Sequence, residues 1–159
     1  MMERYIGAKI VHAEPMNEGE FRLEKGFTDV SEELLKTECY REGYKVVYPD
    51  GYVSWSPKAA FEEAYRLTDG MTFGLAVEAA KKGLKIARTG WNGKGMFVVY
   101  QKGYPQGIPS NKQTAMAWGI NEGDLFRCEP YLQIKMVNGS HAMWVPSIND
   151  VLAEDWMIF

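Results

Sequence analysis

The sequence predicts an α+β fold of two small modules, each a mainly antiparallel sheet with one or two helices. Two observations lead to this prediction: aromatic and β-branched runs flank tight turns in both halves, and the charge changes sign near Gly70. Residues 1–70 hold 9 Lys and Arg against 14 Asp and Glu (net −5), and residues 71–159 hold 9 against 7 (net +2), which sum to −3. We therefore expect modules at residues 1–69 and 71–159, joined by the turn at Asp69-Gly70.

In the first module, the apolar run Tyr5–Val11 predicts a strand that ends at Glu14-Pro15, because proline cannot continue a ladder. Residues 43–48 and 52–55 flank Pro49-Asp50-Gly51, a pattern typical of a β-hairpin. These three segments predict a small antiparallel sheet.

A helix is expected after the hairpin, with Ser56 as its N-cap and Pro57 as its first residue. The apolar face of this helix would consist of Phe61, Ala64 and Tyr65.

The second module begins with a predicted helix over residues 72–82, capped at its end by Gly83. One apolar stripe follows the i, i+3, i+4, i+7 spacing of a buried helix face: Phe73, Ala76, Val77 and Ala80. Strands are expected at residues 85–88, 96–101, 131–137 and 142–145, and an edge or closing strand at 155–159. The third and fourth of these flank Asn138-Gly139, a second hairpin signal.

Composition argues against several classes of protein. A pI near 5.5 does not favour DNA or RNA binding, and no apolar run is long enough to span a membrane. Cys39 and Cys128 are isolated, and His12 and His141 lie near no carboxylate pattern, so we expect no metal site and no cofactor.

Positive charge is concentrated in one window of this acidic chain. Between Glu78 and Glu122 there is no Asp or Glu, yet seven Lys and Arg residues fall there, among them Arg88 and Lys94. Aromatic residues, including Phe97 and Tyr104, are interleaved with them, and this combination suits a small anionic ligand with a flat ring. A solvated basic face on an ordinary domain is the alternative.

The best candidate for a ligand loop is Gly90–Gly95, in which glycines would let main-chain N–H groups form an anion nest. Lys94 would add a charge, and Trp91 a face on which a base can stack. The alternative is a tight Asn92-Gly93 turn with Trp91 packed beneath it.

Two further segments have alternative roles. Gly103–Asn111 is expected to be a loop, either a lid or a plain connector. After Trp144, Ser147 and Asp150 could bind ribose hydroxyls, or Ser147 could cap a short helix that ends near Ala153.

Catalysis finds little support in the sequence. No Ser, Cys or Thr lies in a nucleophile motif, and Glu154 and Asp155 are adjacent, so on a strand they would point to opposite faces. We therefore expect a protein that holds a ligand and does not transform it.

Several spaced motifs of residues 71–159 resemble the phage Thoeris anti-defence type two family. These motifs are Thr72-Phe73-Gly74, Ala87–Met96, Gly119–Gly123, Pro130-Tyr131, Trp144–Ser147 and Asp150–Trp156. Residues 5–66 resemble a short module common in phage and prophage proteins.

The resemblance implies a non-catalytic sponge in the cytoplasm of the bacterial host. Members bind cyclic ADP-ribose isomers made by TIR-domain defence enzymes, such as glycocyclic ADP-ribose, and some also hold cyclic dinucleotides. They form homo-oligomers, often tetramers, with ligand pockets at subunit interfaces, so we expect a tetramer here. Carried over by position, the pocket residues are Trp91, Asn92, Trp144, Pro146, Ser147 and Asp150, to which the basic, aromatic window adds Arg88, Lys94, Phe97 and Tyr104.

Two other classes compete with this interpretation. The first is a structural or interaction protein of a phage or prophage without a nucleotide ligand, and the second is a nucleotide-processing enzyme. Two features depart from the family pattern: the acidic first module is extra to the minimal family member, and Ser147-Ile148-Asn149-Asp150 replaces the commoner Ser-Gln-Thr-Asp. The second of these could alter ligand choice.

Overall fold

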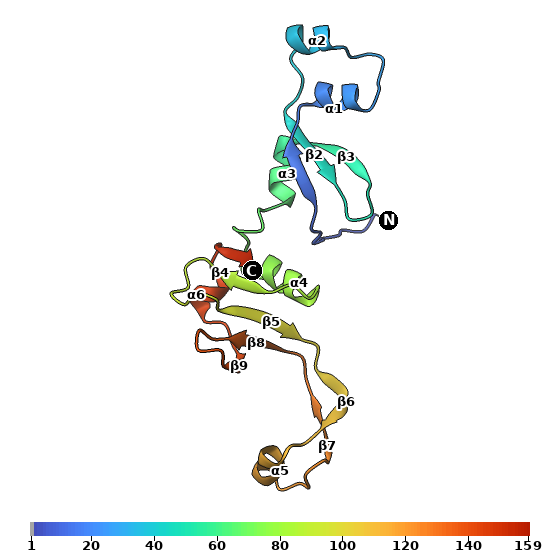
Figure 1. Cartoon of the computed structure of the whole chain (residues 1–159). Coiled ribbons are helices and arrows are strands. Elements are labelled where there is room, and N and C mark those ends of the chain that lie inside the picture. Colours follow the sequence, from blue (N-terminus) through green and yellow to red (C-terminus); the bar gives the residue numbers. More distant parts are fainter. Residues whose placement is uncertain (1) are drawn as a thin grey trace. The chain divides into compact units, whose positions relative to one another are not determined.

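The structure is a computed structural model that describes residues 2–159 (Figure 1). The chain divides into two compact units, with the boundary in the sequence between Arg66 and Leu67. The described residues contain six helices and ten strands in three sheets, and every strand pair is antiparallel. The predicted α+β class is therefore confirmed.

The first unit is a three-stranded sheet in the order β1-β2-β3 with three helices. Its elements are β1 (His12–Pro15), α1 (Glu18–Glu24), α2 (Glu32–Thr37), β2 (Gly43–Val47), β3 (Val53–Pro57) and α3 (Lys58–Ala64). The predicted hairpin around Asp50-Gly51 is confirmed as β2 and β3.

The predicted strand over Tyr5–Val11 is wrong, because the strand begins only at His12. His12 faces Val47, the last residue of β2, so the residues before His12 lie beyond the end of their neighbour. A strand-forming sequence extends a ladder only as far as the neighbouring strand runs beside it.

The helix after the hairpin exists, but it begins one residue later than predicted. Ser56 and Pro57 belong to β3, and Pro57 occupies the N-cap position of α3 without a side-chain cap. Phe61 of α3 stacks on Tyr44 of β2 and on Tyr65, with ring centroids 4.3 and 4.8 Å apart. These contacts place α3 on one face of the sheet.

Helices α1 and α2 were not predicted, although both begin at clear capping residues. Asn17 and Glu20 form a capping box at α1, and the Ser31 hydroxyl accepts from Leu34 N–H at α2. The Trp55 indole donates to the Met16 carbonyl at 2.8 Å, which fastens the start of α1 to β3.

The second unit is built on a five-stranded sheet in the order β10-β4-β5-β8-β9. Its elements are α4 (Phe73–Lys81), β4 (Ile86–Arg88), β5 (Phe97–Gln101), β6 (Tyr104–Pro109), α5 (Lys112–Trp118), β7 (Leu125–Cys128), β8 (Tyr131–Lys135), β9 (His141–Trp144), α6 (Ile148–Val151) and β10 (Trp156–Ile158). The predicted second hairpin and the predicted edge strand at the end of the chain are confirmed.

The core of this unit lies where α4 covers one face of the sheet. Thr72 caps α4, and Ala76, Ala79 and Ala80 are buried against the sheet. Beneath them lie fully buried side chains of three strands, Ile86, Val98 and Trp156. The predicted helix of residues 72–82 is confirmed, and its small alanines let the helix approach the sheet closely.

A two-stranded arm leaves this sheet, with α5 at its tip (Figure 1). The arm consists of β6 and β7, so the prediction that residues 103–111 form a loop is wrong. The two prolines of β6 stand in a two-stranded ribbon, where a missing N–H is tolerated at the edge. None of the helices within residues 2–159 is long and apolar enough to cross a membrane.

Candidate functional site

Three tryptophans from distant parts of the second unit form a cluster, in which Trp91 follows β4 and Trp144 and Trp156 belong to the two edge strands of the five-stranded sheet. Trp91, Trp144 and Trp156 contact one another edge to face, with ring centroids 5.5 to 6.0 Å apart. The ring of Phe73, at the start of α4, has its centroid 5.3 Å from that of Trp156 and 6.5 Å from that of Trp144. Trp156 is fully buried, whereas Trp91 and Trp144 remain partly exposed. The cluster therefore has a buried base and an accessible outer side.

Arg88, the last residue of β4, lies beside this cluster between two carboxylates. Its Nε donates to Asp155 Oδ1 at 2.7 Å, and its Nη1 donates to Asp150 Oδ1 at 2.9 Å. About four-fifths of each of the Arg88 and Asp150 side chains is buried, since they are 19% and 13% exposed. The positive charge of Arg88 is thus already balanced within the chain.

Asp150 connects this ion pair to the tryptophans and to α6. Its Oδ1 also accepts from the Trp91 indole N–H at 3.3 Å, and its Oδ2 accepts from the Ser147 hydroxyl at 2.6 Å. The Trp156 indole donates to the Asp150 main-chain carbonyl at 2.9 Å. Ser147 and Asp150 form a capping box at α6, which is one of the two roles predicted for Ser147.

Both carboxyl groups are ionised well below neutral pH. Burial opposes ionisation of Asp150, but hydrogen bonds from Ser147, Arg88 and Trp91 outweigh it and lower the pKa of Asp150 to about 2. The hydrogen bond from Arg88 lowers the pKa of Asp155, while Asp155 and Asp150 together raise the pKa of Arg88. Neither carboxyl group is therefore poised to exchange a proton near pH 7.

The glycines of the Gly90–Gly95 loop have identifiable packing reasons. A Cβ at Gly90 would lie 2.7 Å from Asp155 Oδ2, which accepts the Gly90 N–H at 2.9 Å. Gly93 packs against the Met96 and Val137 side chains, and Gly95 has a φ of +77°. Because the N–H groups of Gly90 and Trp91 already donate to Asp155 and to the Arg88 carbonyl, the predicted anion nest cannot begin at these two residues.

The structure brings together half of the ten predicted site residues: Arg88, Trp91, Trp144, Ser147 and Asp150. Asn92 and Lys94 lie exposed on the same loop, and Pro146 is partly buried between β9 and α6. Two predicted residues lie elsewhere. Because side chains alternate along β5, Phe97 lies on the face opposite Val98, where it contacts Lys85 and Lys135. Tyr104 is the first residue of β6, in the arm.

Several of the basic residues between Glu78 and Glu122 lie away from the tryptophan cluster. Lys81 pairs with Glu78 at 2.9 Å, Lys85 lies 4.7 Å from the Phe97 ring centroid, and Lys112 lies in α5 at the tip of the arm. Lys94 makes no ion pair with another residue of the described chain. It is thus the available cation on the ligand loop.

Asp155 and Trp156 are parts of this site that sequence reasoning missed. The sequence predicts both residues in the closing strand at 155–159 and in the motif Asp150–Trp156, but predicts neither as a site residue. The arrangement depends on β10 pairing with β4, which sets Trp156 opposite Arg88. Only the motif Asp150–Trp156 near the end of the chain could have suggested it.

No group of three or more His, Cys, Asp or Glu side chains within residues 2–159 could hold a metal ion. The arrangement offers aromatic faces, an exposed lysine and loop main chain, held by a buried ion-pair network. Chemically, it is suited to hold a flat, polar ligand.

Residues 71–159 match the Thoeris anti-defense 2-like domain (Tad2-like). Among curated proteins, Thoeris anti-defense 2 from Bacillus phage SP01 is 38% identical over 92 residues, which are 55% of this chain and 93% of that protein. The family match includes the whole tryptophan cluster and all three members of its ion-pair network.

Proposed function

The chain belongs to the Thoeris anti-defense 2-like family, and on that premise we propose that it counters Thoeris defence in a host bacterium by sequestering a nucleotide signal. The proposed ligand is a cyclic ADP-ribose isomer, bound and released without chemical change. A cyclic dinucleotide is a second candidate ligand. The observation that carries the proposal is the family match over residues 71–159.

The site supports binding over catalysis. A nucleotide offers a flat base and anionic phosphates, which the outer side of the tryptophan cluster and Lys94 could contact. Asp150 and Asp155 both pair with Arg88 and have lowered pKa values, so neither serves as a general acid near pH 7.

The predicted site residues divide into two roles in this proposal. Trp91, Asn92, Lys94, Trp144 and Pro146 would face the ligand, whereas Arg88, Asp150 and Ser147 would hold these groups in place. Phe97 and Tyr104 do not lie at the tryptophan cluster of their own chain. They could contribute only through a further site or a neighbouring subunit.

Incubation of the purified protein with a cyclic ADP-ribose isomer separates the three classes of function. After removal of free ligand and heating, release of the intact isomer supports sequestration. A new product in the supernatant would indicate an enzyme, and absence of retained nucleotide would indicate a structural or interaction protein. The same assay with a cyclic dinucleotide tests the second ligand.

We further propose that the protein is a homo-oligomer, and a tetramer in particular. Several large apolar side chains of the second unit are exposed, among them Trp118 at 65%, Met116 at 76% and Leu125 at 66%, all on the arm. Light scattering at micromolar concentration should give a multiple of 18.1 kDa, and a mass of 18.1 kDa would contradict the proposal.

A further inference from the structure

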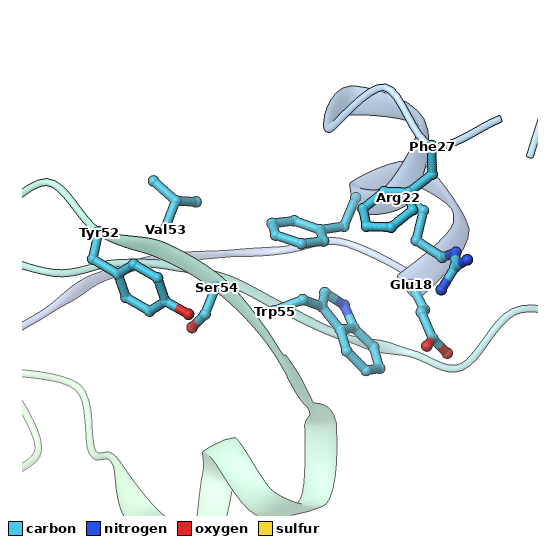
Figure 2. A pocket seen from close by; sticks show the side chains of 8 residues that line it. Glu18, Arg22, Phe27, Tyr52, Val53, Ser54 and Trp55 are labelled. Carbon is cyan, nitrogen blue, oxygen red and sulfur yellow. The ribbon is translucent and has the colours of Figure 1, made fainter.

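The first unit contains an open hollow of about 330 Å³ between β3 and α1 (Figure 2). Four consecutive residues, Tyr52 to Trp55, line one side, and residues of α1 and the turn after it line the other: Glu18, Phe21, Arg22 and Phe27. Successive side chains of a strand point to opposite faces, so a hollow that touches all four must run along the edge of β3. Half of its lining residues are aromatic.

The charged groups of this hollow are already paired. Arg41 holds Glu18 through two hydrogen bonds of 2.8 and 2.9 Å, and Arg22 pairs with Asp29. Both arginines also lie over aromatic rings, Arg41 over Trp55 and Arg22 over Phe27. The hollow is therefore suited to an apolar or aromatic side chain and not to a free ion.

The edge of β3 presents main-chain groups that the sheet does not use. β3 is the last strand in the order β1-β2-β3, and its pairing is fixed at both ends by Tyr48 N–H to the Tyr52 carbonyl and Lys58 N–H to the Glu42 carbonyl. In an antiparallel ladder, hydrogen-bonded pairs alternate with non-hydrogen-bonded ones. The main-chain groups of Val53 and Trp55 consequently point away from β2, which is the arrangement that an added strand requires.

The chain also contains an exposed apolar stretch near its start. Tyr5 and Ile6 are 88% and 101% exposed, although their apolar run predicts a strand. An exposed apolar segment and an exposed strand edge are both sites where chains associate.

We propose that residues Glu3–Gly7 of a second copy of this chain bind along β3 as a fourth strand, with Tyr5 directed toward the aromatic hollow. Charge does not oppose this pairing, since Glu3–Gly7 carries one acid and one base and β3 carries no charged residue. This inference concerns the first unit and goes beyond the function proposed for the second.

The reach of the chain favours a second copy over the segment of the same chain. Gly7 is five residues before His12, so the two Cα atoms lie at most about 17 Å apart. A strand added beside β3 lies three strand spacings from β1, about 14 Å in a straight line through the hairpin. The difference between these two lengths leaves little chain for the segment to pass around the hairpin. In addition, Lys9 Nζ already lies 5.2 Å from the centroid of the Tyr48 ring.

Disulfide trapping between two differently tagged full-length chains tests the proposal, after Cys39 and Cys128 are replaced by serine. One chain carries Ile6→Cys and the other Val53→Cys, and the mixture is oxidised at micromolar concentration. We expect at least tenfold more mixed dimer than for a control pair in which Leu67→Cys, 79% exposed, replaces Ile6→Cys. Equal yields in the two mixtures, or no mixed dimer, would overturn the proposal.

Amide hydrogen exchange of the unmodified chain provides a second test that does not depend on these variants. The Val53 and Trp55 amides should exchange at least tenfold more slowly as protein concentration rises, and Ile6→Pro should abolish that change because proline cannot complete a ladder. Protection that persists at concentrations where light scattering shows a monomer would assign the fourth strand to the same chain and refute a second copy. Cyclic ADP-ribose binding should be the same with and without Ile6→Pro. The proposed strand addition and the proposed ligand binding can therefore fail independently of each other.

Discussion

Arg88 illustrates how a residue's role depends on partners that lie far away in the sequence. Its place in an acid-free window predicts a cation free to bind phosphate, but Asp150 and Asp155, 62 and 67 residues further on, balance its charge. The residue types at this site could be predicted from the sequence. The pairing of those residues could not, because it depends on β10 returning beside β4.

The ionisation of Asp150 predicts a loss of stability in acid. Its pKa is about 2 in the folded chain against an ordinary value of 3.8, so its contribution is complete above pH 3.8 and disappears as pH falls toward 2. The contribution is about 2 kcal/mol, at roughly 1.4 kcal/mol per pKa unit. Asp155 is shifted in the same direction and adds to the effect.

Urea unfolding between pH 2 and pH 5 measures this effect, with the signal of the second unit as the readout. In Asp150→Asn the free energy of unfolding should depend less steeply on pH over this range. The matched control is Glu154→Gln, an exposed acid nearby, which should leave the slope unchanged. Equal slopes for Asp150→Asn and the unmodified chain would contradict the prediction.

Trp91 is the residue whose replacement should most weaken binding of a cyclic ADP-ribose isomer. Stacking of a base on an aromatic side chain contributes about 1–3 kcal/mol, so Trp91→Ala should raise Kd roughly tenfold to a hundredfold. Calorimetry measures this change. Trp91→Phe, which keeps a ring but loses the indole hydrogen bond to Asp150, should retain most of the affinity.

Because Trp91 also packs on Trp144 and Trp156, its alanine variant must first be shown to be folded by circular dichroism. Tyr52→Ala is the matched control, since Tyr52 is exposed in the first unit and lies outside the family match. A folded Trp91→Ala protein with unchanged affinity would show that the Gly90–Gly95 loop is only a structural turn.

At the scale of elements, prediction succeeded where local sequence determines structure and failed where a partner does. The two hairpins and α4 follow from turn residues and apolar spacing within about fifteen residues. The segment Tyr5–Val11 has the composition of a strand, but the strand begins only at His12, opposite Val47 at the end of β2. Prolines and glycines in β6 concealed a strand that its pairing with β7 stabilises.

Two adjacent valines of β5 test which face of the five-stranded sheet is the core. Val98 is fully buried under α4, whereas Val99 is only partly buried on the opposite face. Val98→Ala should lower the free energy of unfolding by about 2–3 kcal/mol, because it leaves a cavity, and Val99→Ala by less than about 1 kcal/mol. Urea unfolding at pH 7 compares them, and equal losses would refute the assignment of faces.

At the scale of the whole molecule, the two units have separate cores. Val46 is buried in the first unit, and the cluster around Ile86, Val98 and Trp156 belongs to the second. The family match and the proposed binding site both lie in residues 71–159. Ligand should therefore stabilise the second unit and leave the local stability of the first unchanged.

Amide hydrogen exchange on the full chain measures both units in one experiment. At about 100 times Kd, a ligand that binds only the folded state stabilises it by about 2.7 kcal/mol, so the Val98 amide should exchange about a hundredfold more slowly. The Val46 amide of the first unit serves as an internal control and should exchange at its original rate, because its local unfolding does not release the ligand. Equal slowing of both amides would mean that the units unfold together or that both contact the ligand, and unchanged exchange at Val98 would contradict binding in the second unit.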